Sequence, residues 1–329
     1  MQTPGSRPPR RTACHWLPSP KKSPRVCENQ KRLINEVMSH NPLTEPNKII
    51  QGLWVGDELS MMEQLSIASF LENKHEYHLY IYDQVKNVPV GTVVKDASAI
   101  LPPSMIFQYQ GRPSYAGFAN FFRYKLLWER GGWWADTDVV CLKPFDFSDE
   151  HVFATEVVNG PEVIASSIIK APAGSRVMAY CWDVCKTKKP EALVWGETGP
   201  KLLGEAVQRF SEPRFVQPHT VFCPISYDVW RTVLDEAAEI ELDKDAHSIH
   251  LWNEMWRLAG QDKNGEYPSS CLYGQLKQKY LPRGGERAQS VGKAAITSSM
   301  TRAPAGSEAA ANAVRTGSGV TPIPGSQAE

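Results

Sequence analysis

The chain has 329 residues, of which 22% are charged, and its 36 Lys and Arg balance 36 Asp and Glu. This is the composition of a soluble globular protein, and the balanced charge gives no global field that would attract nucleic acid. Seven scattered cysteines without a C-x-x-C pair indicate neither a disulfide framework nor a zinc knuckle, so we expect a cytoplasmic protein, with peripheral membrane association left open.

The two ends of the sequence differ in composition from its middle. Residues 1–46 contain eight prolines and eight Lys or Arg but one aromatic residue, which predicts a disordered leader because little apolar surface can be buried there. Residues 283–329 are rich in Ala, Gly, Ser, Thr and Pro and predict a disordered tail. The folded domain is then 47–282. No run approaches the roughly 18 apolar residues of a membrane-spanning helix, so no transmembrane segment is expected.

Within this domain, β-rich runs alternate with helical patterns. In chain order, the predicted strands are 48–55, 77–82, 134–142, 151–157, 163–171 and 248–252, and the predicted helices are 59–73, 114–130, 174–187 and 198–210. This alternation predicts an α/β fold with one open, Rossmann-like, mostly parallel sheet flanked by helices. Ligands of such sheets bind beyond the carboxyl ends of the strands, which directs attention to 54–57 and 136–138.

The helix predicted at 114–130 is apolar almost all round and should be buried, with Ser114 as its cap. Asn120 and Arg123 interrupt the apolar surface and share a face. A buried guanidinium needs an anionic partner, which could be a substrate or a core carboxylate. The following Gly131-Gly132 pair is expected to end the helix, not to cradle phosphate.

Asp136 and Asp138 follow at positions i and i+2 of a predicted strand end. Alternate residues of a strand point to one side, so the two Cα atoms should lie roughly 6–7 Å apart. Two carboxylates that close are unfavourable unless a cation lies between them, and hard oxygen ligands suit Mn²⁺ or Mg²⁺. An Asp-X-Asp sequence on its own also occurs in ordinary turns.

The residues around this pair carry a resemblance to a known group. The sequence Phe-Arg-Tyr-(x)₆-Gly-Gly-Trp-Trp-Ala-Asp-Thr-Asp, at 122–138, resembles the signature of the DXD sugar transferases, which include α-1,4-galactosyl- and N-acetylglucosaminyltransferases and the family 32 mannosyltransferases. Segments 49–56, 196–203 and 250–253 resemble further parts of these enzymes in the same order. The resemblance implies a GT-A fold, a metal-dependent glycosyltransferase reaction with retention of configuration, and a nucleotide-sugar donor, most often a UDP-sugar.

The resemblance also implies roles for individual residues. It places Asp136 and Asp138 at the metal and the donor ribose, and Arg123 with them in the catalytic group. His250 would bind the metal or the diphosphate, and Trp54 would stack on the base. The other residues implied in the donor pocket are Asn120, Trp134, Gly199, Trp252 and Asn253.

Two departures from the signature leave the donor sugar open. Relatives have Ser-Asp where this chain has Ala119-Asn120, and that aspartate helps to hold sugar hydroxyls; Trp134 replaces a tyrosine. The acceptor, whether a glycan, a lipid-linked glycan or a protein, is also open. No nucleophile or general base is indicated.

His250 and Trp252 would share one side of the predicted 248–252 strand, with His247 on the other side. An imidazole ligand is more acceptable to Mn²⁺ than to Mg²⁺, so manganese is the expected cofactor. A lone histidine in a strand can equally be structural. Trp195, Trp230, Trp256, Cys181 and Cys185 are expected to be packing residues.

Two other functions are compatible with the same residues. One is a metal-dependent nucleotide-sugar hydrolase or pyrophosphatase, which would be expected to have a denser ligand set around two metals. The other is a non-catalytic relative that binds a glycan or a protein.

Overall fold

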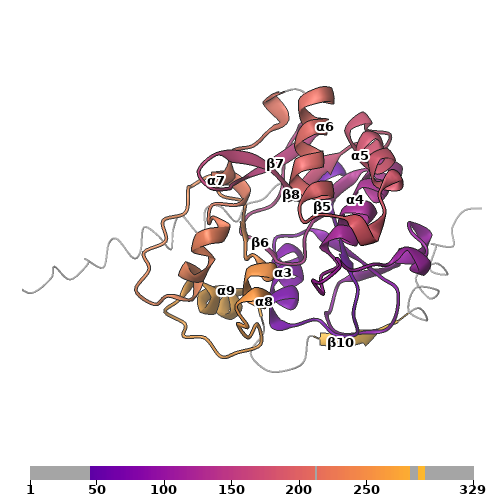
Figure 1. Ribbon diagram of the computed structural model, residues 1–329. Helices are drawn as coiled ribbons and strands as arrows, with labels where there is room; N and C mark the ends of the chain where they lie inside the picture. Colours follow the sequence, from indigo (N-terminus) through magenta and orange to yellow (C-terminus); the bar gives the residue numbers. More distant parts are fainter. Residues whose placement is uncertain (1–44, 212, 282–287, 293–329) are drawn as a thin grey trace, which may run out of the picture.

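The computed structural model describes residues 45–211, 213–281 and 288–292 (Figure 1). Its largest sheet has six strands in the order β4-β2-β1-β5-β8-β7. The four strands from β4 to β5 are parallel, and only β8 opposes its neighbours. The predicted α/β fold with a mostly parallel sheet is therefore confirmed. The strands are β1 Ile49–Trp54, β2 Glu76–Ile81, β4 Val93–Asp96, β5 Gly132–Ala135, β7 Val152–Val157 and β8 Glu162–Ala171.

Helices cover both faces of this sheet because successive side chains of β5 point in opposite directions. Trp134 packs with Phe122 and the other apolar residues of α4, α5 and α6. Trp133 packs with Phe145 on the face covered by α3. Figure 1 shows α4, α5 and α6 grouped together and α3, α8 and α9 grouped in the other half of the molecule. These helices are α3 Met61–Glu72, α4 Ala116–Arg130, α5 Arg176–Thr187, α6 Leu202–Phe210, α8 Asn253–Leu258 and α9 Leu272–Tyr280.

The remaining helices of the described residues are short. They are the α-helices α2 Glu45–Lys48 and α7 His219–Phe222, the π-helical turn η4 Glu197–Lys201, and the 3₁₀ helices η1 Ala97–Ala99, η2 Pro103–Met105, η3 Pro190–Ala192, η5 Pro213–Phe215 and η6 Tyr227–Leu234. None of the helices in the described part of the chain has both the length and the apolar character needed to cross a bilayer.

One end of α4 agrees with the prediction from the sequence, and the other does not. Gly131 ends the helix as predicted, with φ at 67°, and a Cβ there would lie 2.5 Å from the backbone nitrogen of Ala173. Only glycine fits this conformation and this space. The predicted cap is corrected, because the helix begins at Ala116 after Tyr115, which provides no side-chain cap, and Ser114 Oγ accepts only a 3.4 Å bond from the Ala116 N–H.

Two predicted strands are shorter than expected. The run at 134–142 is broken, because β5 ends at Ala135 and β6 Val139–Cys141 pairs with β9 Ser248–His250 in a separate two-stranded sheet. Asp136 to Asp138 form the turn between them, in which the Val139 N–H bonds to the Asp136 carbonyl at 3.0 Å. The run at 248–252 ends at His250, and Trp252 takes a left-handed conformation that starts α8.

The predicted tail boundary is corrected by one strand. β10 Ala288–Val291 pairs with β3 Val85–Pro89, and Val291 is buried among the apolar residues there. The average amino-acid composition of residues 283–329 does not reveal a single short strand, such as β10, that can pair with the exposed edge of another strand. The rest of the predicted tail, apart from Gly292, and the predicted leader up to residue 44 lie outside the described residues.

Candidate active site

The Asp-Thr-Asp turn and the end of β9 bring three candidate metal ligands together. His250 pairs with Val139, the first residue after the turn, so its imidazole lies beside both aspartates. One ligand atom each from Asp136, Asp138 and His250 lies within 4.8 Å of the others. The sequence placed these residues in one site, and the structure does bring them together. Their convergence comes from a turn and a strand pair, not from one extended strand.

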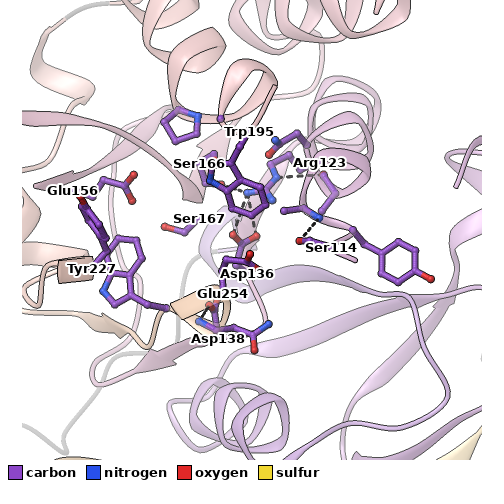
Figure 2. Close-up of a pocket in the computed structure, with 18 of the residues that line it drawn as sticks. Ser114, Arg123, Asp136, Asp138, Glu156, Ser166, Ser167, Trp195, Tyr227 and Glu254 are labelled. Atoms are coloured by element: carbon purple, nitrogen blue, oxygen red, sulfur yellow. Dashed lines mark hydrogen bonds and ion pairs between the residues drawn. The ribbon is translucent and has the colours of Figure 1, made fainter. Parts of the chain in front are cut away.

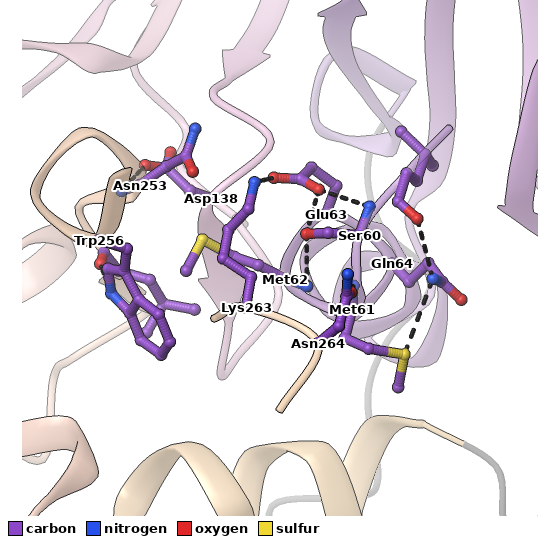
Figure 3. Close-up of polar contacts among 12 residues, drawn as sticks. Ser60, Met61, Met62, Glu63, Gln64, Asp138, Asn253, Trp256, Lys263 and Asn264 are labelled. Carbon is purple, nitrogen blue, oxygen red and sulfur yellow. Dashed lines mark hydrogen bonds and ion pairs between the residues drawn. The ribbon is translucent and has the colours of Figure 1, made fainter. Parts of the chain in front are cut away.

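Asp138 is fixed by the backbone around it. Its Oδ2 accepts a 2.8 Å bond from the Asn253 N–H (Figure 3). The same oxygen lies 3.3 Å from His250 Nε2. Burial opposes its charge, but His250 and the Asn253 bond outweigh burial and lower the pKa of Asp138. For His250, burial is likewise outweighed by the Asp138 carboxylate, which raises the pKa of the imidazole well above its usual value.

A buried ion pair lies in the region that Figure 3 draws together with Asp138. Lys263 forms a 2.6 Å ion pair with the fully buried carboxylate of Glu63, which in turn accepts a bond from the backbone N–H of Ser60 at the start of α3 (Figure 3). The contact joins α3 to the segment that follows α8. A buried carboxylate without this partner would be strongly unfavourable, so the pair fixes the position of that segment.

Asp136 has a different environment. Arg123 Nη1 lies 3.0 Å from Asp136 Oδ1 and also bonds to the carbonyl of Ser166. The indole N–H of Trp134 donates to the same carboxylate at 2.7 Å. Burial raises the pKa of Asp136, with Arg123 opposing and Asp138 adding to the rise. The anionic partner that Arg123 required is therefore Asp136 itself, inside the site.

The three ligands fit a divalent cation that prefers oxygen and nitrogen donors. Carboxylate oxygens and a neutral imidazole nitrogen are suitable ligands for Mn²⁺, and the ligand atoms of Asp136, Asp138 and His250, which all lie within 4.8 Å of one another, could hold such an ion. In the described residues, this is the single group of three such side chains that converges in this way. His250 Nε2 is the nitrogen that faces the Asp138 carboxylate, and the Cys223 thiol, which also interacts with the imidazole, helps to raise the pKa of His250.

A cavity of about 1690 Å³ opens above these residues (Figure 2). Most of the residues expected in the donor site line it: Trp54, Asn120, Arg123, Trp134, Asp136, Asp138, His250, Trp252 and Asn253. Gly199 does not. It is buried behind Asn120, where a Cβ would lie 3.1 Å from Asn120 Nδ2. The predicted donor contact of Gly199 is therefore corrected to a packing role.

The aromatic residues of the pocket take different positions. The indole nitrogen of Trp54 is buried without a hydrogen-bond partner, while other parts of the residue line the cavity. Trp134 lies behind Asp136, which it holds, and any contact of Trp134 with a donor stays a prediction. Trp252 lies beside His250 with ring centres 4.0 Å apart, as expected, although its left-handed backbone and not a strand places it there. His247 faces away and packs against Phe147, also as expected.

Four residues of the pocket were missed by sequence reasoning. Arg112 lies 4.0 Å above the Trp195 ring and forms a 2.8 Å ion pair with Glu254. Trp195 is 43% exposed, so its expected packing role is wrong; Trp230 and Trp256 are buried as expected. The fourth is Glu156 on β7, which is 8% exposed. A carboxylate inside the strand predicted at 151–157 was the signal that could have identified it.

Comparison with known proteins confirms the resemblance seen in the sequence. Residues 28–156 match the model of the glycosyltransferase sugar-binding region containing the DXD motif, and residues 187–286 match that of the alpha 1,4-glycosyltransferase conserved region. Similar curated proteins include lactosylceramide 4-alpha-galactosyltransferase of Mus musculus (22% identity, 49% of this chain and 46% of that protein) and of Pongo pygmaeus (24%, 49% and 76%), and human alpha-1,4-N-acetylglucosaminyltransferase (25%, 49% and 48%).

These matches cover only part of the relatives, since the matched region spans about half the length of most of them. Among solved structures, the PaToxG glycosyltransferase is similar over 56% of this chain and 77% of that chain, with 16% identity and a TM-score of 0.38.

Proposed function

We propose that this chain, which carries both conserved regions of these transferases, transfers a hexose or N-acetylhexosamine from a UDP-sugar to an acceptor hydroxyl with retention of configuration. The observation that carries the proposal is the convergence of Asp136, Asp138 and His250 in a large pocket, in a chain whose aspartates belong to the matched DXD region. The UDP donor, the metal and the retention of configuration rest on the resemblance.

The residues of the chain divide the work of such a transfer. A bound Mn²⁺ would act as a Lewis acid on the diphosphate leaving group. Asp138 and His250 would hold it, because both are buried and face each other. Arg123 already compensates the charge of Asp136, and its guanidinium can also face anionic donor oxygens at the pocket surface.

Two further groups would orient the donor. Trp54 lines the pocket and offers an aromatic wall for the base. Asn120 makes only a long 3.5 Å contact with Thr198, so its amide is free to bond a sugar hydroxyl. The depth of the pocket would keep water away from the reacting carbon.

The alternative of a two-metal hydrolase has less support. Such a centre needs more ligands than one trio, and the described residues contain a single convergent group. A purely binding role would not need the paired aspartates that the site keeps in place.

A donor panel tests the proposal. The purified full chain would be incubated with UDP- and GDP-sugars, Mn²⁺ and glycan, glycolipid and peptide acceptors, and products would be identified by mass spectrometry. We expect transfer from a UDP-sugar that stops when EDTA removes the metal. Release of nucleoside monophosphate in place of diphosphate would identify a pyrophosphatase, and the absence of any turnover would reject the enzyme proposal.

A further inference from the structure

Glu156 places a carboxyl group in the pocket that none of the roles above uses. It lies on β7 and lines the pocket, whereas its neighbour on the strand, Thr155, does not line the pocket and bonds to Glu162 and to the carbonyl of Gln217. Because neighbouring residues of a strand alternate, Glu156 faces the pocket. Figure 2 shows it on the opposite side of Asp136 from Arg123.

The carboxyl of Glu156 has no hydrogen bond or ion pair within the described part of the chain, although the residue is only 8% exposed. Keeping a carboxyl in such a position costs free energy unless something compensates it. It also lies outside the group of ligand atoms formed by Asp136, Asp138 and His250. A structural carboxylate would have a partner, and a metal ligand would lie in that group, so neither role accounts for Glu156.

The titratable groups around Glu156 come from several elements. Asp136, Asp138 and His250 lie on the floor of the pocket, and the Cys223 thiol follows α7. Burial, followed by the two aspartates, outweighs the opposing effect of His250 and raises the pKa of Glu156 to about 7. A group that exchanges a proton near neutral pH is suited to general base catalysis.

We propose that Glu156 is the general base of the transfer, which takes the proton of the acceptor hydroxyl. This inference rests on the proposed transfer reaction. The acceptor oxygen forms a bond to the anomeric carbon on the face from which the diphosphate departs, while the bond from that carbon to the diphosphate oxygen breaks, so the configuration is retained. The proton of the hydroxyl moves to the Glu156 carboxylate, the bonding electron pair leaves with the nucleoside diphosphate, and Glu156 later returns the proton to solvent.

Glu162 provides a matched control on the neighbouring strand. It also borders the pocket, but its carboxylate is bound by the imidazole of His219 at 2.6 Å and by the hydroxyl of Thr155 at 2.7 Å. It is also considerably more exposed than Glu156. A carboxylate with these partners is not available as a base, so its replacement by Gln should change kcat less than about twofold.

The experiment compares Glu156→Gln, Glu156→Ala and Glu162→Gln with the wild-type chain, using the donor and acceptor found in the panel. Glu156→Gln should lower kcat by about 100-fold or more, with the donor KM and Mn²⁺ affinity unchanged. The acidic limb of the wild-type pH profile should disappear. Formate, which can replace the missing carboxylate, should restore part of the activity of Glu156→Ala. The melting temperature of each variant shows whether it is folded.

Three results would overturn this role. They are a folded Glu156→Gln variant with wild-type kcat, a change in donor KM alone, and a Glu156→Ala variant that formate does not rescue. If the wild-type chain transfers no sugar, the proposed function itself fails. Transfer by the wild-type chain together with full activity of Glu156→Gln rejects only the inference about Glu156.

Discussion

The floor of the pocket, formed by Asp136, Asp138 and His250, differs from its mouth, formed by Arg112, Trp195 and Glu254. The floor is held by backbone bonds of the turn and of the β6–β9 pair. The mouth is held by side-chain contacts alone: an ion pair and a stacked guanidinium between three segments far apart in the chain.

Burial differs for part of the two sets. Asp138 and His250 are 9% and 8% exposed, whereas Trp195 is 43% exposed. The side chains of Asp136 and Glu254, at 26% and 22%, do not differ in this way. A site that performs chemistry needs groups held within a fraction of an ångström, which buried backbone contacts provide. Exposed side-chain contacts are weak and can rearrange. We therefore expect the floor to determine whether transfer occurs and the mouth to determine which acceptor is used.

The largest expected effect is that of Asp138→Asn on the floor. The amide keeps the size of the side chain but loses the charge that attracts the metal and pairs with His250. Loss of the Lewis acid removes several kcal/mol of transition-state stabilisation, so kcat should fall about 100-fold or more. The measurement is sugar transfer by a variant that keeps its near-UV circular dichroism. Wild-type activity in that variant would contradict the central role of the floor.

Trp54→Leu tests the pocket residue that should bind the base. Stacking on an aromatic side chain contributes about 1–3 kcal/mol in other base-binding sites, so the Kd for UDP should rise by roughly five- to 150-fold. The measurement is calorimetric titration with UDP and Mn²⁺. If UDP affinity is unchanged and the variant is only less stable, Trp54 is a packing residue.

His250→Ala and His247→Ala separate metal binding from packing. His250 lies beside Asp138, whereas His247 packs against Phe147 on the other side of the strand. Removing His250 should weaken Mn²⁺ binding by at least about tenfold, and removing His247 should leave it unchanged. Equal losses in the two variants would show that the effect is one of folding.

The same histidine predicts a pH dependence of metal binding. The Asp138 carboxylate holds the pKa of His250 well above its usual value, so the metal-free protein keeps the imidazole proton to a higher pH than a free histidine does. A metal requires the neutral form, so binding must release this proton. Mn²⁺ affinity should therefore rise with pH between 6 and 8, and His250→Ala should flatten the rise. Titrations in buffers with different ionisation heats would count the proton.

The floor could be predicted from the sequence because its residues belong to local motifs. Asp136 and Asp138 are two positions apart, and His250 precedes Trp252 in a second motif. Even here, the turn at 136–138 was predicted as part of a strand. The flanking residues have a high strand propensity, and propensity gives no information on the backbone hydrogen bond that closes the turn.

The assembly of the mouth and the pocket-facing position of Glu156 could not be predicted, for physical reasons. Arg112, Trp195 and Glu254 meet only through tertiary packing, and no local spacing brings them together. The position of Glu156 toward the pocket, and not toward solvent, depends on the pairing of β7 with β8 at the sheet edge. Gly199 shows the reverse case, since its motif was recognised but its surroundings make it a packing residue.

The smallest expected effects are those of the mouth, and Arg112 tests them. Its contacts with Trp195 and Glu254 are partly exposed, and such cation–π and ion-pair contacts each contribute about 1 kcal/mol or less. Arg112→Ala should therefore raise the acceptor KM by roughly threefold, with Mn²⁺ affinity and UDP affinity unchanged. Arg112→Lys keeps the charge but loses the planar group that stacks on the indole, so it should retain only part of the wild-type acceptor affinity. Steady-state kinetics with varied acceptor at saturating donor measures both variants. A folded Arg112→Ala variant whose kcat fell as strongly as that of Asp138→Asn would contradict this division. The contacts of Arg112 would then be needed to hold the catalytic groups in place.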